Sequence, residues 1–376
     1  TDDKIINNAE NTGSKTILRV EQNQKTYLWE PFSNKYEGIY HIQRNIYKNT
    51  TGNKVILEEL NEDLSLIFRY KWQVSERFGF VKTAQLENIG HNQTAVDLLD
   101  GIQNILPYGI GASLQNNTSN LANAYKRNEL VNMVKMGIYS LSAMIIDRAE
   151  PSEALKASTV WSNGLKISNV LLTSLQLDNF RKGKKLKKET DMRAEPGAYF
   201  IQSKITLNSK THKHWHIVAD VNQDHKDVYG LIDHLKKTPQ TIEQSLLDDI
   251  QDGTEVLKKL VGTADGLQLT GDQLSVGRHF SNVLFNIMRG GVFEDQYMVE
   301  KNDLIEYYNT INKGLANKYS DFLTQFEEKI TLQNLLNRTL KTKDPDLIRI
   351  TYEYLPLTFT ITGMHLVMPS LHICHP

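Results

Sequence analysis

The sequence has little of several features that define functional classes. Its one cysteine, Cys374, excludes an internal disulfide and every zinc or iron–sulfur site built from several cysteines. The 43 Lys and Arg residues nearly balance the 44 Asp and Glu residues, so the formal net charge of −1 gives no electrostatic argument for a nucleic-acid or membrane partner. No run of about 20 apolar residues is free of Pro and His, so we predict no membrane-spanning helix.

The first ten residues, TDDKIINNAE, show no initiating Met, basic segment or apolar segment. We therefore expect that a targeting signal is absent or already removed. The expected location is the cytoplasm, or the periplasm if a signal was removed. At roughly 150 residues per domain, the length of 376 residues predicts two domains, or one large β domain with an appendage.

The apolar residues of the first 220 positions alternate with polar ones in short runs that are separated by polar turns. This pattern predicts an antiparallel sandwich or barrel rather than a parallel βαβ sheet. Residues 100–107 are expected to form a turn that leads into a loop. The predicted strands cover residues 26–29, 39–47, 54–59, 64–74, 79–86, 94–99, 131–146, 157–165, 198–207 and 215–221.

Beyond Val228 the apolar period changes from two to 3.6, which predicts helices. They are expected over residues 242–261, 272–287, 303–328 and 346–354. Gly253 is predicted to bend or split the first of them, and Asp344 with Pro345 is a suitable N-cap and first residue for the last. The fold class is therefore α+β, with the strands first and the helices afterwards.

The last 23 residues, from Tyr354 to Pro376, contain no Asp, Glu, Lys or Arg, although 23% of the whole sequence is charged. Pro356 and Pro369 prevent one continuous helix here. The segment is either a buried continuation that is cut off early or a terminus that is not native to its domain. In both cases we expect it to be poorly anchored.

Three histidines alternate with other residues at His212, His214 and His216. On a strand their side chains would share one face, about 7 Å apart. Two or three imidazoles with this spacing could bind zinc or copper. The simpler interpretation is the exposed end of a strand, because the sequence identifies no carboxylate that would support a metal ion.

A polar segment at residues 147–153, DRAEPSE, follows an apolar run. Glu150 and Glu153 could form the pair of carboxylates, about 5–10 Å apart, that glycoside hydrolysis requires. Asp147 and Arg148 complete this candidate sugar-binding group. In the simpler interpretation the arginine pairs with one of the glutamates in a structural or domain-contact cluster.

Flat aromatic rings are a further candidate for sugar binding. The sequence contains four tryptophans, Trp29, Trp72, Trp161 and Trp215. Most aromatic side chains in alternating strands form the core. We keep Trp72 as a candidate binding residue.

Five segments resemble a known family: residues 68–83 (FRYKWQVSERFGFVKT), 86–88 (LEN), 98–107 (LLDGIQNILP), 146–155 (IDRAEPSEAL) and 278–282 (RHFSN). They are similar to the amino-terminal region of large bacterial proteins of the cellobiose phosphorylase and cyclic β-1,2-glucan enzyme group, over most of residues 25–355. The resemblance implies three parts. An antiparallel, galactose-mutarotase-like β-supersandwich would occupy residues 1–230, and linker helices with the possible start of an (α/α)6 domain would occupy residues 231–355. Residues 356–376 would form the atypical uncharged tail.

In that family the catalytic carboxylate lies in an (α/α)6 barrel that follows the linker helices. About 20 residues after Leu355 cannot build such a barrel, so no catalytic residue is carried over to this chain. The resemblance therefore implies an accessory, structural segment of a glycoside hydrolase or phosphorylase, inactive alone. Its expected partners are a glucan or oligosaccharide and the barrel domain, a homodimer stays open, and no cofactor is expected.

Two other functions stay open at this point. One is a free-standing carbohydrate-binding module with a mutarotase-like sandwich. The other is metal-dependent activity at His212, His214 and His216. The hypothesis of an accessory segment predicts an exposed apolar patch on the helices between residues 274 and 355, where the barrel would pack.

Overall fold

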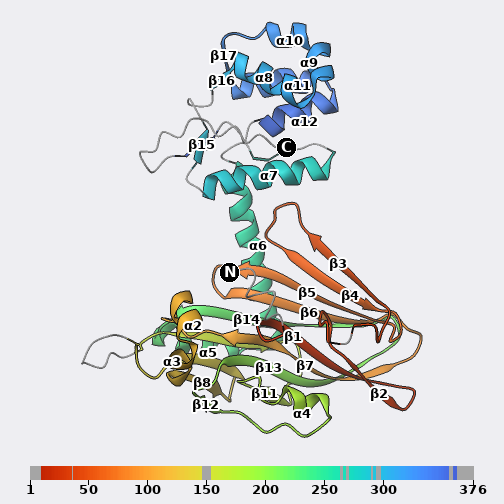
Figure 1. Ribbon diagram of the computed structural model, residues 1–376, viewed down its shortest axis with the longest axis vertical. Coiled ribbons are helices and arrows are strands. Elements are labelled where there is room, and N and C mark those ends of the chain that lie inside the picture. Colours follow the sequence, from red (N-terminus) through yellow and green to blue (C-terminus); the bar gives the residue numbers. More distant parts are fainter. Residues whose placement is uncertain are drawn as a thin grey trace. The chain divides into compact units, whose positions relative to one another are not determined.

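The computed structural model describes residues 10–35, 37–145, 154–262, 266–267, 271–288, 291–293, 298–354 and 359–361. Contacts divide the chain into two units. The sandwich unit comprises Thr1–Tyr47 and Lys54–Gly253, and the helical unit comprises Lys48–Asn53 and Thr254–Pro376. Figure 1 shows both, coloured along the sequence.

The first sheet of the sandwich unit has five antiparallel strands in the order β11-β13-β7-β1-β2. Its long central strands, β7 and β13, pair over eleven residues of β13. The five strands are β1 (Gly13–Gln22), β2 (Lys25–Trp29), β7 (Thr94–Ile105), β11 (Asn169–Leu171) and β13 (Gly197–Leu207).

The second sheet has nine strands in the order β12-β8-β9-β10-β14-β6-β5-β4-β3. From β12 to β4 each neighbouring pair is antiparallel. The strands are β3 (Ile42–Lys48), β4 (Val55–Asn61), β5 (Leu66–Ser75), β6 (Gly79–Asn88), β8 (Lys126–Val131), β9 (Met136–Leu141), β10 (Ala157–Asn163), β12 (Asp191–Arg193) and β14 (His212–Gln223).

The main core lies between the two sheets, because alternation along each strand turns every second side chain inward. In β14, Trp215 and Ile217 belong to this core, whereas Val218 belongs to a cluster on the outer face. His214 and His216 share that outer face by the same alternation. The strand therefore presents its histidines away from the core.

Helices cover part of each outer face. On the five-stranded sheet, α4 (Leu177–Arg181) adds Leu177 and Phe180 to an apolar cluster. On the nine-stranded sheet, α5 (His225–Leu235) and the first half of α6 (Pro239–Gly262) cover the cluster that contains Val218. Two short helices, α2 (Ala112–Asn117) and α3 (Ser119–Ala124), precede β8. The sandwich unit thus includes residues beyond position 230, which we assigned to the helical region.

The structure corrects two predicted elements of the sandwich. Residues 131–146 were expected to form one strand, but residues 132–135 form the turn between β8 and β9. Residues 100–104 were expected to form a turn, but they lie within β7. The buried Asp100 carboxylate is bound there by Thr16, Lys82 and Trp215, so a polar residue is satisfied inside the sheet.

The helical unit has its own core, formed by residues between Val299 and Tyr354. Two short strand pairs accompany its helices: β15 (Gly291–Phe293) with β18 (Phe359–Ile361), and β16 (Met298–Glu300) with β17 (Lys329–Thr331). The helices are α7 (Gln273–Met288), α8 (Lys301–Ile311), α9 (Lys313–Lys318), α10 (Ser320–Thr324), α11 (Leu332–Lys341) and α12 (Pro345–Tyr354).

The helix α6 passes through Gly253 without a break, so the predicted split there is wrong, while a bend stays a prediction. The single helix predicted over 303–328 is wrong, because the segment is divided into α8, α9 and α10. Asn312 leaves helical geometry at the first break (φ −152°, ψ 87°), where its side chain accepts a hydrogen bond from the Leu315 N–H. Tyr319 leaves it at the second (φ −108°, ψ 18°). As predicted, Pro345 begins α12, and Asp344 accepts hydrogen bonds from the first N–H groups of that helix.

The predicted fold class, an antiparallel sandwich followed by a helical region, is confirmed. Of the uncharged segment from Tyr354 to Pro376, the structure describes Tyr354 and β18, and the rest lies outside the described residues. Within the part of the chain that the structure describes, no helix is both long and apolar enough to cross a membrane.

Candidate functional site

The predicted sugar-binding residues have different outcomes. Asp147, Arg148, Glu150 and Glu153 lie outside the described residues, so their role stays a prediction. Trp72 is half-buried in β5, with its ring edge-on to that of Tyr70 at a centroid distance of 6.5 Å. Its role in binding also stays a prediction. The remaining three tryptophans are at most 2% exposed and belong to the apolar clusters, as the simpler interpretation expected.

The three histidines lie on one strand, β14, but the structure brings only two of them together. His214 and His216 meet Glu243 of α6, and one ligand atom from each of the three residues lies within 4.8 Å of the others. His212 begins the strand, is exposed and is not in this cluster. We call His214, His216 and Glu243 the His–His–Glu cluster.

Both imidazoles of the His–His–Glu cluster face the same carboxylate oxygen. His214 Nε2 lies 2.7 Å from Glu243 Oε1, and His216 Nε2 lies 3.5 Å from it. The two ring centroids are 5.8 Å apart. The His214 side chain is 46% exposed and that of His216 only 2%, so the cluster is open to solvent on one side and buried on the other.

Thr83 of β6 contacts the buried His216 ring on the side away from Glu243. It lies directly opposite His216 in the pairing of β6 with β14, and its Oγ1 is 3.0 Å from His216 Nδ1. Because this contact occupies Nδ1, the ring is oriented with Nε2 toward Glu243. The threonine is therefore the positioning residue for His216.

Burial and hydrogen bonding act in opposite directions on the charges of the cluster. Desolvation lowers the pKa of His216, although the hydrogen bond to Glu243 opposes the shift. The pKa of Glu243 is lowered, chiefly by its hydrogen bond to His214. These directions favour a neutral buried imidazole beside an ionised carboxylate.

Packing of α6 on the sheet places Glu243 next to β14. Ile242, Leu246 and Ile250 recur every four residues and form the buried stripe of the helix. At the start of α6, Asn163 Nδ2 donates a hydrogen bond of 3.0 Å to the Pro239 carbonyl, one helical turn before Glu243. The sequence analysis did not identify Glu243 as a candidate ligand. Its place directly after Ile242, the first residue of the apolar stripe, is the signal that could have identified it.

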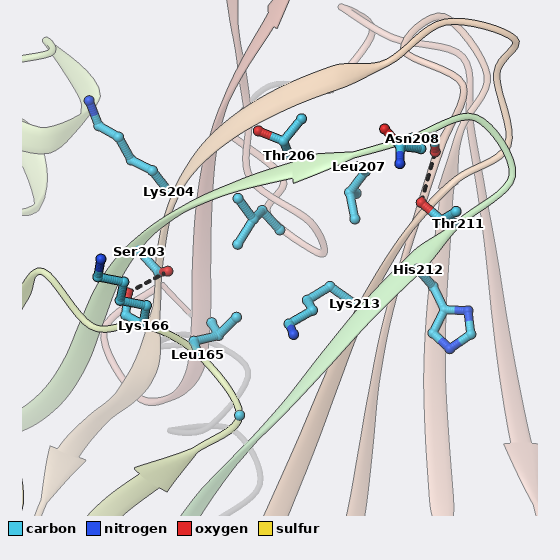
Figure 2. A pocket seen from close by; sticks show the side chains of 12 residues that line it. Leu165, Lys166, Ser203, Lys204, Thr206, Leu207, Asn208, Thr211, His212 and Lys213 are labelled. Atoms are coloured by element: carbon cyan, nitrogen blue, oxygen red, sulfur yellow. Dashed lines mark hydrogen bonds between the residues drawn. The ribbon is translucent and has the colours of Figure 1, made fainter. Parts of the chain in front are cut away.

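A cavity of about 460 Å³ lies between the segment 164–166 and the facing ends of β13 and β14. Figure 2 shows Lys166, Lys204 and Lys213 around it, together with the Thr211 hydroxyl, which donates a hydrogen bond of 2.9 Å to the Asn208 carbonyl. Its described lining contains no Asp, Glu, Phe, Tyr or Trp. Aliphatic side chains, Leu165, Ile205 and Leu207, line it together with the lysines, and no Phe, Tyr or Trp ring of the described lining offers a surface for a sugar.

A second cavity, of about 330 Å³, is lined by residues of β2, β3 and β4 and of the segment between β2 and β3. Two buried carboxylates line it. Glu30 pairs with Lys15 and Arg181, and Glu59 accepts hydrogen bonds from Trp29 Nε1 at 2.8 Å and Arg44 Nε at 2.7 Å. The carboxylates are held by these internal partners, while Tyr40 and Arg44 supply an aromatic ring and a guanidinium.

Comparison with known protein families identifies one segment of the chain. Residues 293–356 match the model of glycoside hydrolase family 149 insertion domain 1. The matched segment lies within the helical unit. The match includes every buried residue of the core between Val299 and Tyr354, and it confirms the predicted resemblance to glycoside hydrolase-like proteins at this coarse level.

No curated protein sequence matches the chain significantly. Among solved structures, a bacterial glucoamylase in complex with acarbose is 10% identical (TM-score 0.40, 85% of this chain and 46% of that chain). A human-microbiome protein described as a kojibiose phosphorylase is 9% identical (TM-score 0.39, 77% of this chain and 36% of that chain). A galactose mutarotase-like protein from Clostridium acetobutylicum is 11% identical (TM-score 0.23, 59% of this chain and 82% of that chain). The chain spans less than half of the first two, and with TM-scores below 0.5 we draw no argument on function from any of them.

Proposed function

We propose that this chain is an accessory, structural part of a larger carbohydrate-active enzyme of the glycoside hydrolase or phosphorylase type. The observation that carries the proposal is the match of residues 293–356 to an insertion domain of glycoside hydrolase family 149. An insertion domain is by definition a segment within a longer enzyme. In this proposal the sandwich unit and the helical unit support a catalytic domain formed by other residues.

The chemistry of the two cavities supports an accessory role. Glycoside hydrolysis needs two carboxyl groups on either side of the bond that is cleaved. The described lining of the larger cavity has none. In the smaller cavity Glu30 and Glu59 are held in ion pairs and hydrogen bonds, which leaves the exposed Glu37 as a single further carboxyl group. Neither cavity therefore presents a pair of carboxyl groups available as acid and base.

The exposed side of α7 supports a further contact with another domain. Leu274, Phe285 and Met288 are 74%, 57% and 75% exposed. At 100° per residue their positions fall within about 60° of one another around the helix. Phe285 and Met288 are neighbours on this side, whereas Gly277, Arg278 and Ser281 lie between them and Leu274. Exposed apolar side chains that gather on one side of a helix occur at contact surfaces, and we assign this side of α7 to a contact with the predicted helical catalytic domain.

Activity assays on the purified 376-residue protein test the proposal first. We expect no sugar or sugar phosphate to be released from β-1,2-, β-1,3- or β-1,4-linked gluco-oligosaccharides, with or without inorganic phosphate. Release above the buffer blank would show that the chain is itself an enzyme and would overturn the accessory role.

A second test uses the longer enzyme that the proposal requires. Replacing Leu274, Phe285 and Met288 together by Gln should lower its activity and its thermal midpoint, because the contact with the catalytic domain is lost. The control is Leu175→Gln, which changes a side chain that is 61% exposed in the sandwich unit and should change neither. Equal effects of both changes would contradict the proposed contact.

Binding without turnover would instead favour a carbohydrate-binding module. The smaller cavity is the candidate for this function, since it combines Tyr40 with Arg44. Tryptophan fluorescence during titration with each oligosaccharide measures binding directly. A signal that is lost in Arg44→Ala but retained in Arg193→Ala, a change at an exposed arginine of β12, would support this second function.

A further inference from the structure

The His–His–Glu cluster has no place in the proposed accessory function, and its ligand atoms suggest a separate one. We propose that His214, His216 and Glu243 bind a divalent metal ion of the zinc type, which joins α6 to β14. All three residues belong to the sandwich unit. The inference does not depend on the match of residues 293–356 to an insertion domain.

The three side chains provide a suitable set of donors. Zinc is commonly bound by imidazole nitrogen and carboxylate oxygen, and three protein ligands with water in the fourth position are a known arrangement. With bonds of about 2.0–2.1 Å, tetrahedral ligands lie about 3.3 Å apart. The observed separations, from 2.7 Å to at most 4.8 Å, bracket this value, and the half-exposed His214 ring has room to adjust.

The surroundings orient the two ligands that are least free to move. Thr83 Oγ1, 3.0 Å from His216 Nδ1, leaves Nε2 directed at Glu243. Such a second contact to a metal-binding histidine fixes the ring and its tautomer. On the other element, the hydrogen bond from Asn163 to Pro239 holds the first turn of α6, which carries Glu243.

A metal-free cluster is the alternative arrangement of the same atoms. In it, both Nε2–H groups would donate to Glu243 Oε1, but the distance of 3.5 Å from His216 is long for such a bond. A cation between the three atoms would bind the lone pairs of all of them. The positive charge of Lys71 acts against a bound cation, since it also lowers the pKa of His216. Burial in turn lowers the pKa of Lys71 itself.

The experiment uses the full 376-residue protein, freed of metal with a chelator and then titrated with zinc chloride. We expect one zinc ion per chain, measured by elemental analysis after gel filtration and by competition with a chromophoric chelator. Glu243→Gln and His214→Ala should each weaken binding by at least about tenfold. His216 is left unchanged because its burial makes folding of a variant uncertain.

The matched control is His212→Ala, which removes a histidine from the same face of the same strand but outside the cluster. It should leave the affinity unchanged. Thr83→Val should weaken binding by about 10–100-fold, and Thr83→Ser should restore it. Circular dichroism of each variant confirms that it is folded before binding is compared.

Two results would overturn the proposal. Absence of stoichiometric zinc binding in the folded, chelator-treated protein would show that the cluster is only a hydrogen-bonded contact. Loss of binding in His212→Ala, together with retention in Glu243→Gln, would show that histidines along the strand bind zinc without the helix.

Discussion

The sandwich unit and the helical unit differ in how far apart along the chain their buried partners lie. In the sandwich, Asp100 accepts hydrogen bonds from Thr16, 84 residues earlier, and from Trp215, 115 residues later. In the helical unit the main core lies between Val299 and Tyr354. The environment of a sandwich residue is therefore decided by distant strands, whereas a helical-unit residue depends on a short stretch of sequence.

The two interiors also differ in chemistry. The sandwich core encloses an ion pair between Lys82 and Asp100, with 2.6 Å between Nζ and Oδ1 and no solvent exposure of either side chain. In the helical unit the corresponding buried contact is neutral, a hydrogen bond between Tyr308 and Thr351. Loss of one partner should thus destabilise the sandwich much more than the helical unit.

The largest expected effect comes from breaking that ion pair. Lys82→Met should lower the free energy of unfolding by about 3–5 kcal/mol, because Asp100 is left as an unpaired buried charge. Adding Asp100→Asn removes the charge and keeps an acceptor for Trp215, so the double variant should recover most of the loss. Urea unfolding measures both.

The matching change in the helical unit is Tyr308→Phe, which should lower the free energy of unfolding by only about 1 kcal/mol. Equal losses for Lys82→Met and Tyr308→Phe would contradict the difference between the two interiors.

The next effect tests close strand packing in the sandwich. A Cβ atom at Gly101 would lie 2.1 Å from the Tyr199 carbonyl oxygen and 2.5 Å from the Phe200 ring. Gly101→Ala should therefore destabilise the sandwich by about 1–3 kcal/mol. Gly230 of α5 is the control, since nothing lies within 4 Å of its Cβ position, and thermal unfolding of Gly230→Ala should show no loss.

A smaller, pH-dependent effect is expected in the helical unit. Hydrogen bonds from Lys318 and Tyr319 hold the pKa of Asp344 well below its usual range. A carboxyl group with a lowered folded-state pKa stabilises the fold above its unfolded pKa of about 3.9, and this contribution is lost as the pH falls further. Asp344→Ala should lower the free energy of unfolding by about 1 kcal/mol at pH 7.

The charge at this cap can be separated from its hydrogen bonds by Asp344→Asn. That variant keeps an N-cap acceptor but should show a flatter loss of stability between pH 5 and pH 2 than the natural protein, as measured by acid titration of helical circular dichroism. An unchanged acid profile would indicate that Asp344 does not control it.

The smallest effect concerns the middle of α6. Nothing lies within 4 Å of a Cβ atom built at Gly253, and the helix is continuous there. Gly253→Ala should therefore raise helix stability by about 0.5–1 kcal/mol, because glycine has the greater conformational freedom when unfolded. A loss of thermal stability would instead indicate that this position needs the freedom of glycine.

Predictions from the sequence were most successful where the signal is local. The change of apolar period after Val228 predicted the order of strands and helices, and Asp344 with Pro345 predicted the start of α12. They failed where a distant contact decides the outcome. Asp100 belongs to a strand because Lys82, Thr16 and Trp215 satisfy it, and none of these partners is near it in sequence.

The candidate metal site shows the same division. The spacing of His214 and His216 predicted two imidazoles on one face of a strand, and β14 confirms it. Spacing could not exclude His212 from the cluster or supply Glu243, which comes from a helix 27 residues after His216. The sequence by itself determined the periodicity, the helix caps and the side on which each strand residue lies, because these depend on neighbours along the chain. Only the tertiary structure decided which buried charges are paired and which donors meet, because those contacts depend on how sheets and helices pack.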